Sequence, residues 1–239
     1  MATIPFENLD VLLGKAISIS RDGIISKILD ERRGGYCFEH NHLFRWVLEE
    51  IGFKVVPMIS RVRWQAASDE FTPLTHMILK VEVDGQTFLA DVGYGGLGLI
   101  EPLAFDIGKV QHEGFEPRRL VERGRDCVHQ VLIKEVWEDL YQFEAAEVLA
   151  IDLEVGNWYS CTHPDAHFKN AILTAVATDR KRIILNNTKL TIRHYTGEVV
   201  VRELESYEEV IEVLETEFGL SLPSGERLNC PELIFDADK

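Results

Sequence analysis

The first 52 residues carry apolar side chains at the three- and four-residue spacing of amphipathic helices. One group, Ile24, Ile25, Ile28 and Leu29, follows Ser20, a residue type that caps helix N-termini. A second helix is predicted to begin near Cys37, after the glycine pair at 34–35, and to stop at Gly52. Its apolar positions are Leu43, Phe44, Val47, Leu48 and Ile51.

The pattern then changes to short apolar runs typical of strands. Residues 77–83 and 86–92 flank Asp84 and Gly85, which together are a strong signal for a two-residue hairpin turn. Residues 128–133 and 140–143 are further strand candidates. We therefore expect residues 53–160 to form a β-rich, barrel-like module.

The last part of the chain mixes the two patterns. Residues 161–180 read as a short helical connection, followed by strands at 182–185, 189–195 and 199–204 with turn residues between them. Ser206 and Glu209 have the spacing of a capping box, and the helix that they start should end at Gly219. Three modules are predicted: helical over 1–52, β-barrel-like over 53–160, and a linker helix with an α/β lid over 161–239.

Composition and charge limit the function classes. Hydrophobic residues make up 46% and charged residues 27% of the 239 residues, a globular balance that excludes a disordered chain. The net charge of −15 disfavours nucleic acid and anionic membranes as partners. No apolar run reaches the ~20 residues of a membrane helix, and the N-terminus lacks the pattern of a secretory signal. We expect a cytoplasmic protein whose four cysteines are free thiols.

Cys37 is the cysteine placed for chemistry. It follows two glycines, which allow a substrate to approach the backbone, and it precedes an amphipathic helix. The partial positive charge of a helix N-terminus favours a thiolate. A buried structural cysteine is the alternative for such a position. The other cysteines, Cys127, Cys161 and Cys230, lack this setting and are predicted to be structural.

The predicted hairpin brings a histidine and an aspartate together. A two-residue turn pairs Val83 with Gln86, and continuing that register places His76 and Asp91 on one face as diagonal neighbours, roughly 7–8 Å apart at the backbone. An aspartate that holds a histidine in one tautomer is the orienting half of a catalytic triad. An ion pair at a hairpin end is the alternative. The sequence does not show whether Cys37 meets His76.

Several segments resemble the arylamine N-acetyltransferase family. RGGYCFEHN at residues 33–41 resembles the active-site segment of that family, and Thr75 with His76 and DVGYG at residues 91–95 resemble its histidine and aspartate motifs. IPFENLD at residues 4–10 is similar to its N-terminal segment. Later similar positions are Trp158, Tyr159, His163, Pro164 and Phe168. The similarity covers nearly the whole chain.

The resemblance implies an α+β fold related to papain-like and transglutaminase-like enzymes, with a helical bundle, a β-barrel and an α/β lid. Family members usually have more helical sequence before residue 4, so we expect a shortened first module. The implied activity is acetyl transfer from acetyl-CoA, through a thioester on Cys37, to an arylamine, arylhydrazine or N-arylhydroxylamine. His76 would be the base and Asp91 would orient it.

The resemblance also implies binding roles. Thr75, Gly93, Tyr94 and Gly95 would contact coenzyme A, and Phe38 with Tyr94 would line the acceptor pocket. Acetyl-CoA would act as a substrate, with no tightly bound cofactor and no metal. The family often has phenylalanine where this chain has Tyr94, so the extra hydroxyl could change acceptor preference or donate a hydrogen bond to an acyl intermediate.

Two other site types fit the sequence less well. Residues 93–98 match the dinucleotide pattern G-x-G-x-x-G, but Pro102 interrupts any following helix and no acidic residue ends a second strand about 20 residues later. Cys37, His40 and His42, and likewise Cys161, His163 and His167, lack the paired spacing of structural zinc sites.

Three other functions remain as alternatives. One is biosynthetic amide formation from a carrier-bound or longer acyl group. Another is a papain- or transglutaminase-like hydrolase, against which the absence of a C-G-x-C-W segment argues. The third is a binding protein without catalysis.

Overall fold

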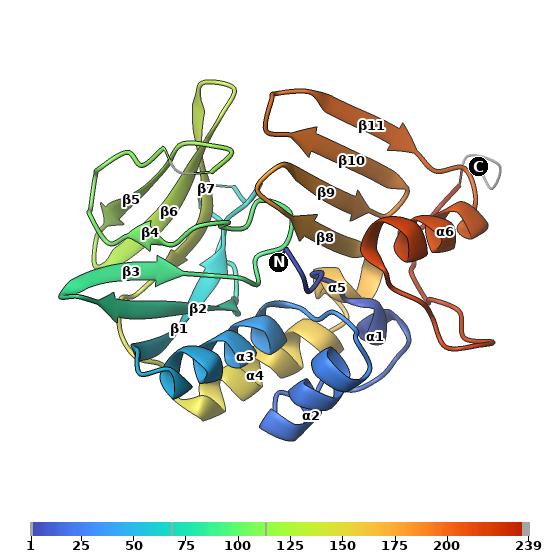
Figure 1. The fold of residues 1–239 in the computed structure, drawn as a ribbon, viewed down its shortest axis with the longest axis horizontal. Helices are drawn as coiled ribbons and strands as arrows, with labels where there is room; N and C mark the ends of the chain where they lie inside the picture. The colour runs from blue at the N-terminus through green and yellow to red at the C-terminus, as the bar shows by residue number, and fades with distance from the viewer. Residues whose placement is uncertain (1, 68, 113, 236–239) are drawn as a thin grey trace.

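A computed structural model describes residues 2–67, 69–112 and 114–235 of the chain. Figure 1 shows two antiparallel sheets side by side, with most of the helices gathered below them and one helix against the second sheet. This arrangement is the α+β architecture expected from the sequence. No helix within the described residues is long and apolar enough to cross a membrane.

The N-terminal helices follow the predicted pattern. The Ser20 hydroxyl accepts a hydrogen bond of 3.2 Å from the Gly23 N–H, which caps α2 and confirms the predicted start. The second predicted helix is α3, which begins at Cys37 and ends two residues before Gly52. The elements of this part are α1 (Leu9–Leu12), α2 (Arg21–Ile25), the π-helix η1 (Ser26–Asp30) and α3 (Cys37–Glu50).

A strongly curved sheet of seven antiparallel strands forms the middle of the chain (Figure 1). Its strands are β1 (Lys54–Val62), β2 (Leu74–Val83), β3 (Gln86–Ala90), β4 (Leu103–Ala104), β5 (Arg118–Arg123), β6 (Asp126–Ile133) and β7 (Val136–Phe143). Their order across the sheet is β4-β3-β2-β1-β7-β6-β5. Helix α3 contacts β1 and β2, so the helix that carries Cys37 lies against the strand that carries His76.

The predicted hairpin has the predicted register. Val83 pairs with Gln86 and Leu79 pairs with Ala90. Continued by one residue, this register places Asp91 opposite Ile78 of β2, two residues from His76. Asp84 and Gly85 both have left-handed backbones, with φ of 51° and 79°. A two-residue turn of this kind matches the twist of the strands that it joins.

A second sheet of four antiparallel strands, in the order β11-β10-β9-β8, stands beside the first. Its strands are β8 (Leu173–Ala177), β9 (Lys181–Asn186), β10 (Lys189–His194) and β11 (Val199–Glu203). Helix α6 (Tyr207–Phe218) packs on it through Val210, Leu214 and Phe218. Ser206 caps α6 by accepting from the Glu209 N–H at 3.2 Å, and Gly219 follows the helix with φ of 66°, both as predicted.

The structure differs from the expectation between residues 150 and 177. Helix α4 (Ala150–Thr162) occupies the end of the segment predicted to be β-rich. The prediction of strands was therefore wrong for these residues. Strand β8 lies within the segment predicted as a helical connection, where only the short α5 (His167–Asn170) is helical. Helix α4 packs on β2 and β8 pairs with β9, so long-range contacts decide both elements. The division of the chain at residues 52 and 160 stays a prediction.

A short N-terminal segment joins the two halves of the fold. Phe6 exchanges two backbone hydrogen bonds with Ala175 of β8, at 2.8 and 2.9 Å, and Glu7 donates one of 2.9 Å to the Gly35 carbonyl. Residues 5–7 therefore lie between the glycine pair that precedes Cys37 and the edge of the second sheet.

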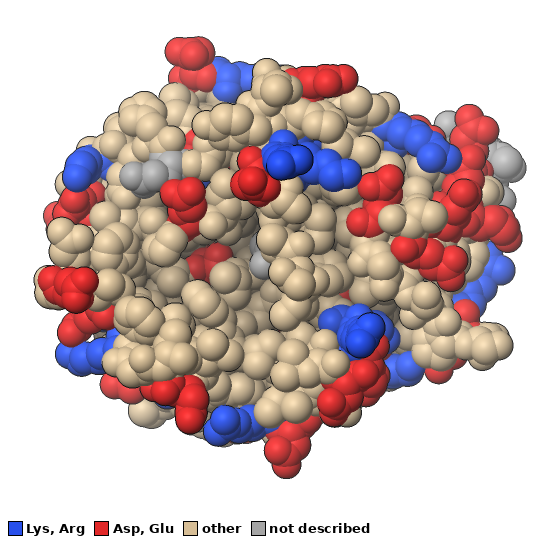
Figure 2. All heavy atoms as spheres, viewed as in Figure 1, with Lys and Arg blue, Asp and Glu red and all other residues tan. Residues whose placement is uncertain are grey.

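Figure 2 shows a face made largely of other residues, with acidic side chains scattered mainly around its rim and smaller groups of Lys and Arg among them. No broad basic surface is visible on this face, which agrees with the net charge of −15.

Candidate active site

Cys37 is the first residue of α3 and is 2% exposed. The carboxylate of Glu39 accepts a hydrogen bond of 2.9 Å from the Tyr36 N–H, which caps this helix end. The Lys27 ammonium lies 2.8 Å from the other oxygen of Glu39. Burial raises the pKa of Glu39 to about 7 although Lys27 opposes the shift. The local sequence thus fixes the turn that presents Cys37.

His76 and Asp91 form a buried pair. The His76 Nε2 lies 2.8 Å from the Asp91 Oδ2, and the two residues are 3% and 2% exposed. Burial alone lowers the pKa of an imidazole, but the Asp91 charge, the hydrogen bond to Asp91 and the Cys37 sulfur together raise the pKa of His76 to about 10. Burial also opposes ionisation of Asp91, yet the His76 charge and its hydrogen bonds lower the pKa of this carboxyl group.

The structure brings Cys37 to this pair. The Cys37 sulfur is among the groups that raise the pKa of His76, so it lies near the imidazole, whose Nε2 is taken by Asp91. The Cys37 Sγ also lies 3.5 Å from the Thr75 carbonyl oxygen, which precedes His76. The three side chains are therefore ordered sulfur, imidazole and carboxylate, an arrangement suited to nucleophilic catalysis.

The second oxygen of Asp91 is held by Asn41, to which the sequence assigned no role, and by the backbone of Gly93, which was predicted only as a coenzyme A contact. The Asn41 amide donates to the Asp91 Oδ1 at 3.0 Å, and the Gly93 N–H donates to the same oxygen at 2.9 Å. Asn41 lies one helical turn after Cys37, so only its spacing on a predicted helix could have indicated a role.

Aromatic rings enclose His76. The Tyr94 and Tyr141 rings each lie 5.1 Å from the imidazole, centroid to centroid. The Tyr94 hydroxyl donates to the Leu140 carbonyl at 3.2 Å, so it is already committed inside the protein. The Tyr141 hydroxyl is buried and has no hydrogen-bond partner among the described residues. These rings keep water from the imidazole and restrict its motion.

The glycine-rich loop at 93–98 passes very close to Cys37. A Cβ atom added to Gly93 would lie 2.6 Å from the Cys37 Cα, so only glycine fits there. Gly95 has φ of 82°, a conformation that suits glycine, and a Cβ there would touch the Phe6 ring at 3.4 Å. Strand β3 precedes this loop and strand β4, not a helix, is the next described element after it, which supports rejecting a dinucleotide fold.

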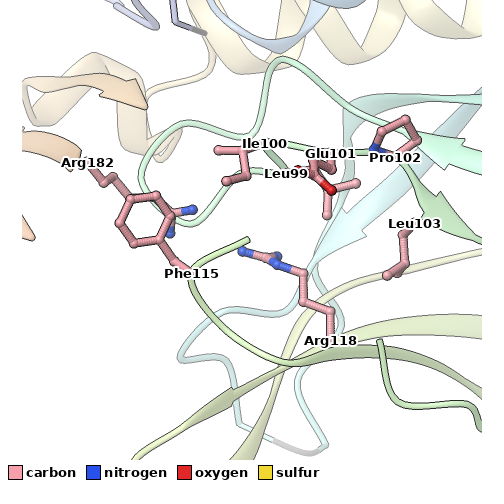
Figure 3. Close-up of a pocket in the computed structure, with 8 residues that line it drawn as sticks. All are labelled: Leu99, Ile100, Glu101, Pro102, Leu103, Phe115, Arg118 and Arg182. Carbon is pink, nitrogen blue, oxygen red and sulfur yellow. The ribbon is translucent and has the colours of Figure 1, made fainter. Parts of the chain in front are cut away.

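Two buried arginines hold the far end of this loop. Arg118 of β5 donates to the Leu97 carbonyl at 2.8 Å, and Arg182 of β9 donates to the Gly98 carbonyl at 3.0 Å. Both guanidinium groups lie near Glu116, at 3.3 and 3.2 Å. Figure 3 shows them reaching from opposite sides toward a cavity of about 10 Å³, the room of one water.

The predicted acceptor residues differ in exposure. Phe38 is fully buried, with its ring 5.8 Å from the Tyr36 ring and its tip under Gly156 of α4. Tyr94 is half-buried beside His76. The roles of Phe38 and Tyr94 in acceptor binding, and of Thr75, Gly93, Tyr94 and Gly95 in coenzyme A binding, stay predictions.

The alternative metal sites find no support. The ring nitrogens of His40 face the carbonyl oxygens of Val92 and Pro5, at 3.0 and 3.1 Å, and His42 faces that of Phe38 at 2.7 Å. Over the described ranges, no group of three or more His, Cys, Asp or Glu side chains could hold a metal ion. Burial raises the pKa of the Cys127 and Cys230 thiols, which favours the unreactive form.

Known proteins are similar to this chain in both sequence and fold. A family model described as N-acetyltransferase matches residues 1–227. The arylamine N-acetyltransferase of Mycolicibacterium smegmatis is 40% identical over 224 residues, which cover 92% of this chain and 81% of that protein. A solved structure of an M. smegmatis arylamine N-acetyltransferase superposes with a TM-score of 0.90 at 38% identity, covering 96% of this chain and 87% of the other. The structure of Mycobacterium marinum arylamine N-acetyltransferase in complex with CoA superposes with a TM-score of 0.86 at 37% identity, over 90% of this chain and 81% of the other.

Proposed function

The chain belongs to the arylamine N-acetyltransferase family, and on that premise we propose that Cys37, His76 and Asp91 are its catalytic triad. The chain is an acetyl-CoA-dependent arylamine N-acetyltransferase. The observation that supports the triad most directly is the buried 2.8 Å pair of His76 and Asp91 beside the Cys37 sulfur.

The first half-reaction loads the enzyme. With its pKa raised to about 10, His76 is an imidazolium at neutral pH, and its positive charge beside Cys37 favours a thiolate nucleophile. The Cys37 thiolate attacks the carbonyl carbon of acetyl-CoA, and the tetrahedral oxyanion forms beside the N-terminus of α3, where backbone N–H groups without helical partners stabilise it. The bond to the CoA sulfur breaks, His76 gives that sulfur its proton, and acetyl-Cys37 remains.

The second half-reaction transfers the acetyl group. The acceptor nitrogen attacks the thioester carbonyl while the neutral His76 takes a proton from it. The tetrahedral intermediate collapses with loss of the Cys37 thiolate. The amide leaves, and Cys37 and the protonated His76 are ready for the next acetyl-CoA. Asp91 keeps the Nε2 of His76 occupied, so the other ring nitrogen serves both proton transfers.

The binding roles follow from the same premise. Gly93 lies against Cys37, so the loop at 93–98 is close enough to the nucleophile to meet the acyl donor. The M. marinum relative whose solved structure contains CoA supports a coenzyme A thioester as donor. We infer that Thr75, Gly93, Tyr94 and Gly95 contact the donor and that Phe38 and Tyr94 shape the acceptor side. Small aromatic amines and hydrazines are the proposed acceptors, and a cytoplasmic location stays a prediction.

The test is an intact-mass measurement after mixing with acetyl-CoA in the absence of acceptor. We expect one acetyl group on the wild type, none on Cys37→Ala, and one on the control Cys161→Ala, because Cys161 lies away from a helix N-terminus. Adding an arylamine or arylhydrazine should remove the group and yield its N-acetyl derivative. Loss of the group to water at the same rate with and without amine would identify a hydrolase. Loading only by longer acyl donors would point to biosynthetic amide formation, and an unreactive Cys37 would indicate a binding protein.

A further inference from the structure

Asn41 connects the parts of the triad that come from different segments of the chain. It lies on α3 one turn after Cys37 and is fully buried. We propose that Asn41 is a positioning residue that fixes Asp91 against His76 and ties both to the helix that carries the nucleophile. This inference rests on the proposed function.

The Asn41 amide makes three hydrogen bonds to its neighbours. Its Nδ2 donates to the Met77 carbonyl at 2.7 Å and to the Asp91 Oδ1 at 3.0 Å, and its Oδ1 accepts from the Val92 N–H at 3.0 Å. If the amide nitrogen and oxygen were exchanged, the amide oxygen would face the Met77 and Asp91 oxygens, and the amide N–H₂ would face the Val92 N–H. Both arrangements are repulsive. The neighbours therefore allow one orientation only.

This orientation determines how Asp91 meets His76. The Asp91 Oδ1 receives Asn41 and the Gly93 N–H, which leaves the Oδ2 for the imidazole at 2.8 Å. Without the Asn41 donor, one hydrogen bond to the Oδ1 remains and the carboxylate is freer to turn. The Asn41 hydrogen bond is also among the causes that lower the pKa of Asp91. Its removal should raise that pKa.

The same amide links three elements. It starts from α3, holds Met77 of β2 next to His76, and holds Val92 in the loop next to Asp91. A shift of one of these elements by 1 Å would misplace the nucleophile relative to its base, and misplacements of that size can slow catalysis by about 10²-fold. Asn41 is thus placed to act on the rate of reaction through Asp91 and His76 without touching the substrate.

The chain contains a matched control. Asn8 is 2% exposed, and its Nδ2 donates to the Phe168 and Ala171 carbonyls at 3.0 and 2.8 Å while its Oδ1 accepts from the Leu173 N–H at 2.9 Å. Its amide makes the same two donations and one acceptance as that of Asn41, but only to backbone groups. Asn8→Ala therefore reproduces the structural loss of Asn41→Ala without removing a contact to the triad.

The experiment compares wild type, Asn41→Ala and Asn8→Ala in two assays. The first is the single-turnover rate of Cys37 acetylation as a function of acetyl-CoA concentration, with Tm measured for each protein. We expect both variants to lose a similar amount of Tm. Asn41→Ala should lower the limiting acetylation rate about 10- to 100-fold at an unchanged half-saturating acetyl-CoA concentration. Asn8→Ala should stay within about 3-fold of the wild type, because its amide bonds only backbone groups.

The second assay is the pH dependence of Cys37 alkylation by iodoacetamide, which needs no acyl transfer. We expect the acid limb of the profile to move to higher pH in Asn41→Ala alone, because Asp91 then loses its charge at higher pH. Should Asn41→Ala not fold, Asn41→Leu avoids most of the cavity and removes the donor to Asp91 without adding a charge, and should show the same loss of acetylation rate at neutral pH.

The two assays separate the outcomes. Equal acetylation rates and superimposable alkylation profiles for both alanine variants would overturn the positioning role. A wild type that is not acetylated, with an alkylation profile that still shifts in Asn41→Ala, would refute the proposed function and leave the positioning role standing.

Discussion

Replacing Gly93 by alanine tests how tightly the glycine-rich loop is fitted to the nucleophile. The added Cβ would lie 2.6 Å from the Cys37 Cα, 2.9 Å from the Asn41 Nδ2 and 3.1 Å from the Cys37 carbonyl oxygen. Non-bonded carbon atoms normally stay about 3.5–4.0 Å apart, so roughly 1 Å of movement is required. The Cα belongs to the backbone at the start of α3, and a side-chain rotation cannot relieve the contact.

The expected effect follows from that distance. Overpacking of this kind destabilises by about 1–3 kcal/mol, which lowers Tm by roughly 2–12 °C for a chain of this size. A displacement of about 1 Å between Cys37 and His76 should slow Cys37 acetylation about 10²-fold. The assay is the single-turnover acetylation rate by intact mass, together with thermal unfolding.

Gly96→Ala in the same loop is the matched control. A Cβ there would meet the terminal methyl group of Ile184 at 3.1 Å, which can rotate away, and neither Gly93 nor Gly96 has a left-handed backbone. We expect Gly96→Ala to acetylate close to the wild-type rate. A Gly93→Ala protein with the Tm and acetylation rate of the wild type would refute the packing argument, since the loop could then not lie against Cys37 as described.

Three further predictions concern the triad and its surroundings. Asp91→Asn keeps the shape but removes the charge that holds His76 protonated, so acetylation of Cys37 should fall by about 10²–10⁴; an unchanged rate would remove Asp91 from the triad. The pKa of His76 is raised from 6.5 to about 10, so the stability that its protonated form adds is complete below pH 6.5 and lost as pH rises through 10. Urea unfolding should accordingly show the stability difference between wild type and Asp91→Asn shrinking over that window, and a constant difference would contradict the pKa shift. Tyr94→Phe removes the hydrogen bond to the Leu140 carbonyl and should cost about 1 kcal/mol in urea unfolding while the ranking of arylamine acceptors stays the same; a changed ranking would mean that the hydroxyl reaches the acceptor.

The part of the site that the sequence predicts is the part made by local structure. Asp84 and Gly85 specify a two-residue turn, which fixes the register and therefore puts His76 and Asp91 on one face. Likewise Ser20, Ser206 and Gly219 act through neighbours only a few residues away, and their helix ends lie where predicted. Local chemistry of this kind does not depend on how the modules pack.

Other features depend on packing between distant segments and could not be predicted in this way. Helix α4 contains β-branched residues and Gly156, which favour helix weakly. Gly156 is needed because a Cβ there would lie 2.9 Å from both the Leu74 carbonyl oxygen and the Phe38 ring. The meeting of Cys37 with His76, and of Asn41 with Asp91, likewise requires α3 to dock on β2.

The pairing of Phe6 with Ala175 has a consequence for synthesis on the ribosome. The segment that holds Gly35, and with it the turn before Cys37, completes its own hydrogen bonds only after β8 has emerged. Some 140 residues separate Gly35 from Ala175, which at about 5–20 residues per second amounts to roughly 7–28 s of translation. During that interval the nascent chain carries Cys37 without its final supports. The order of segments along the chain therefore leaves the turn before Cys37 to be completed only when most of the protein has been synthesised.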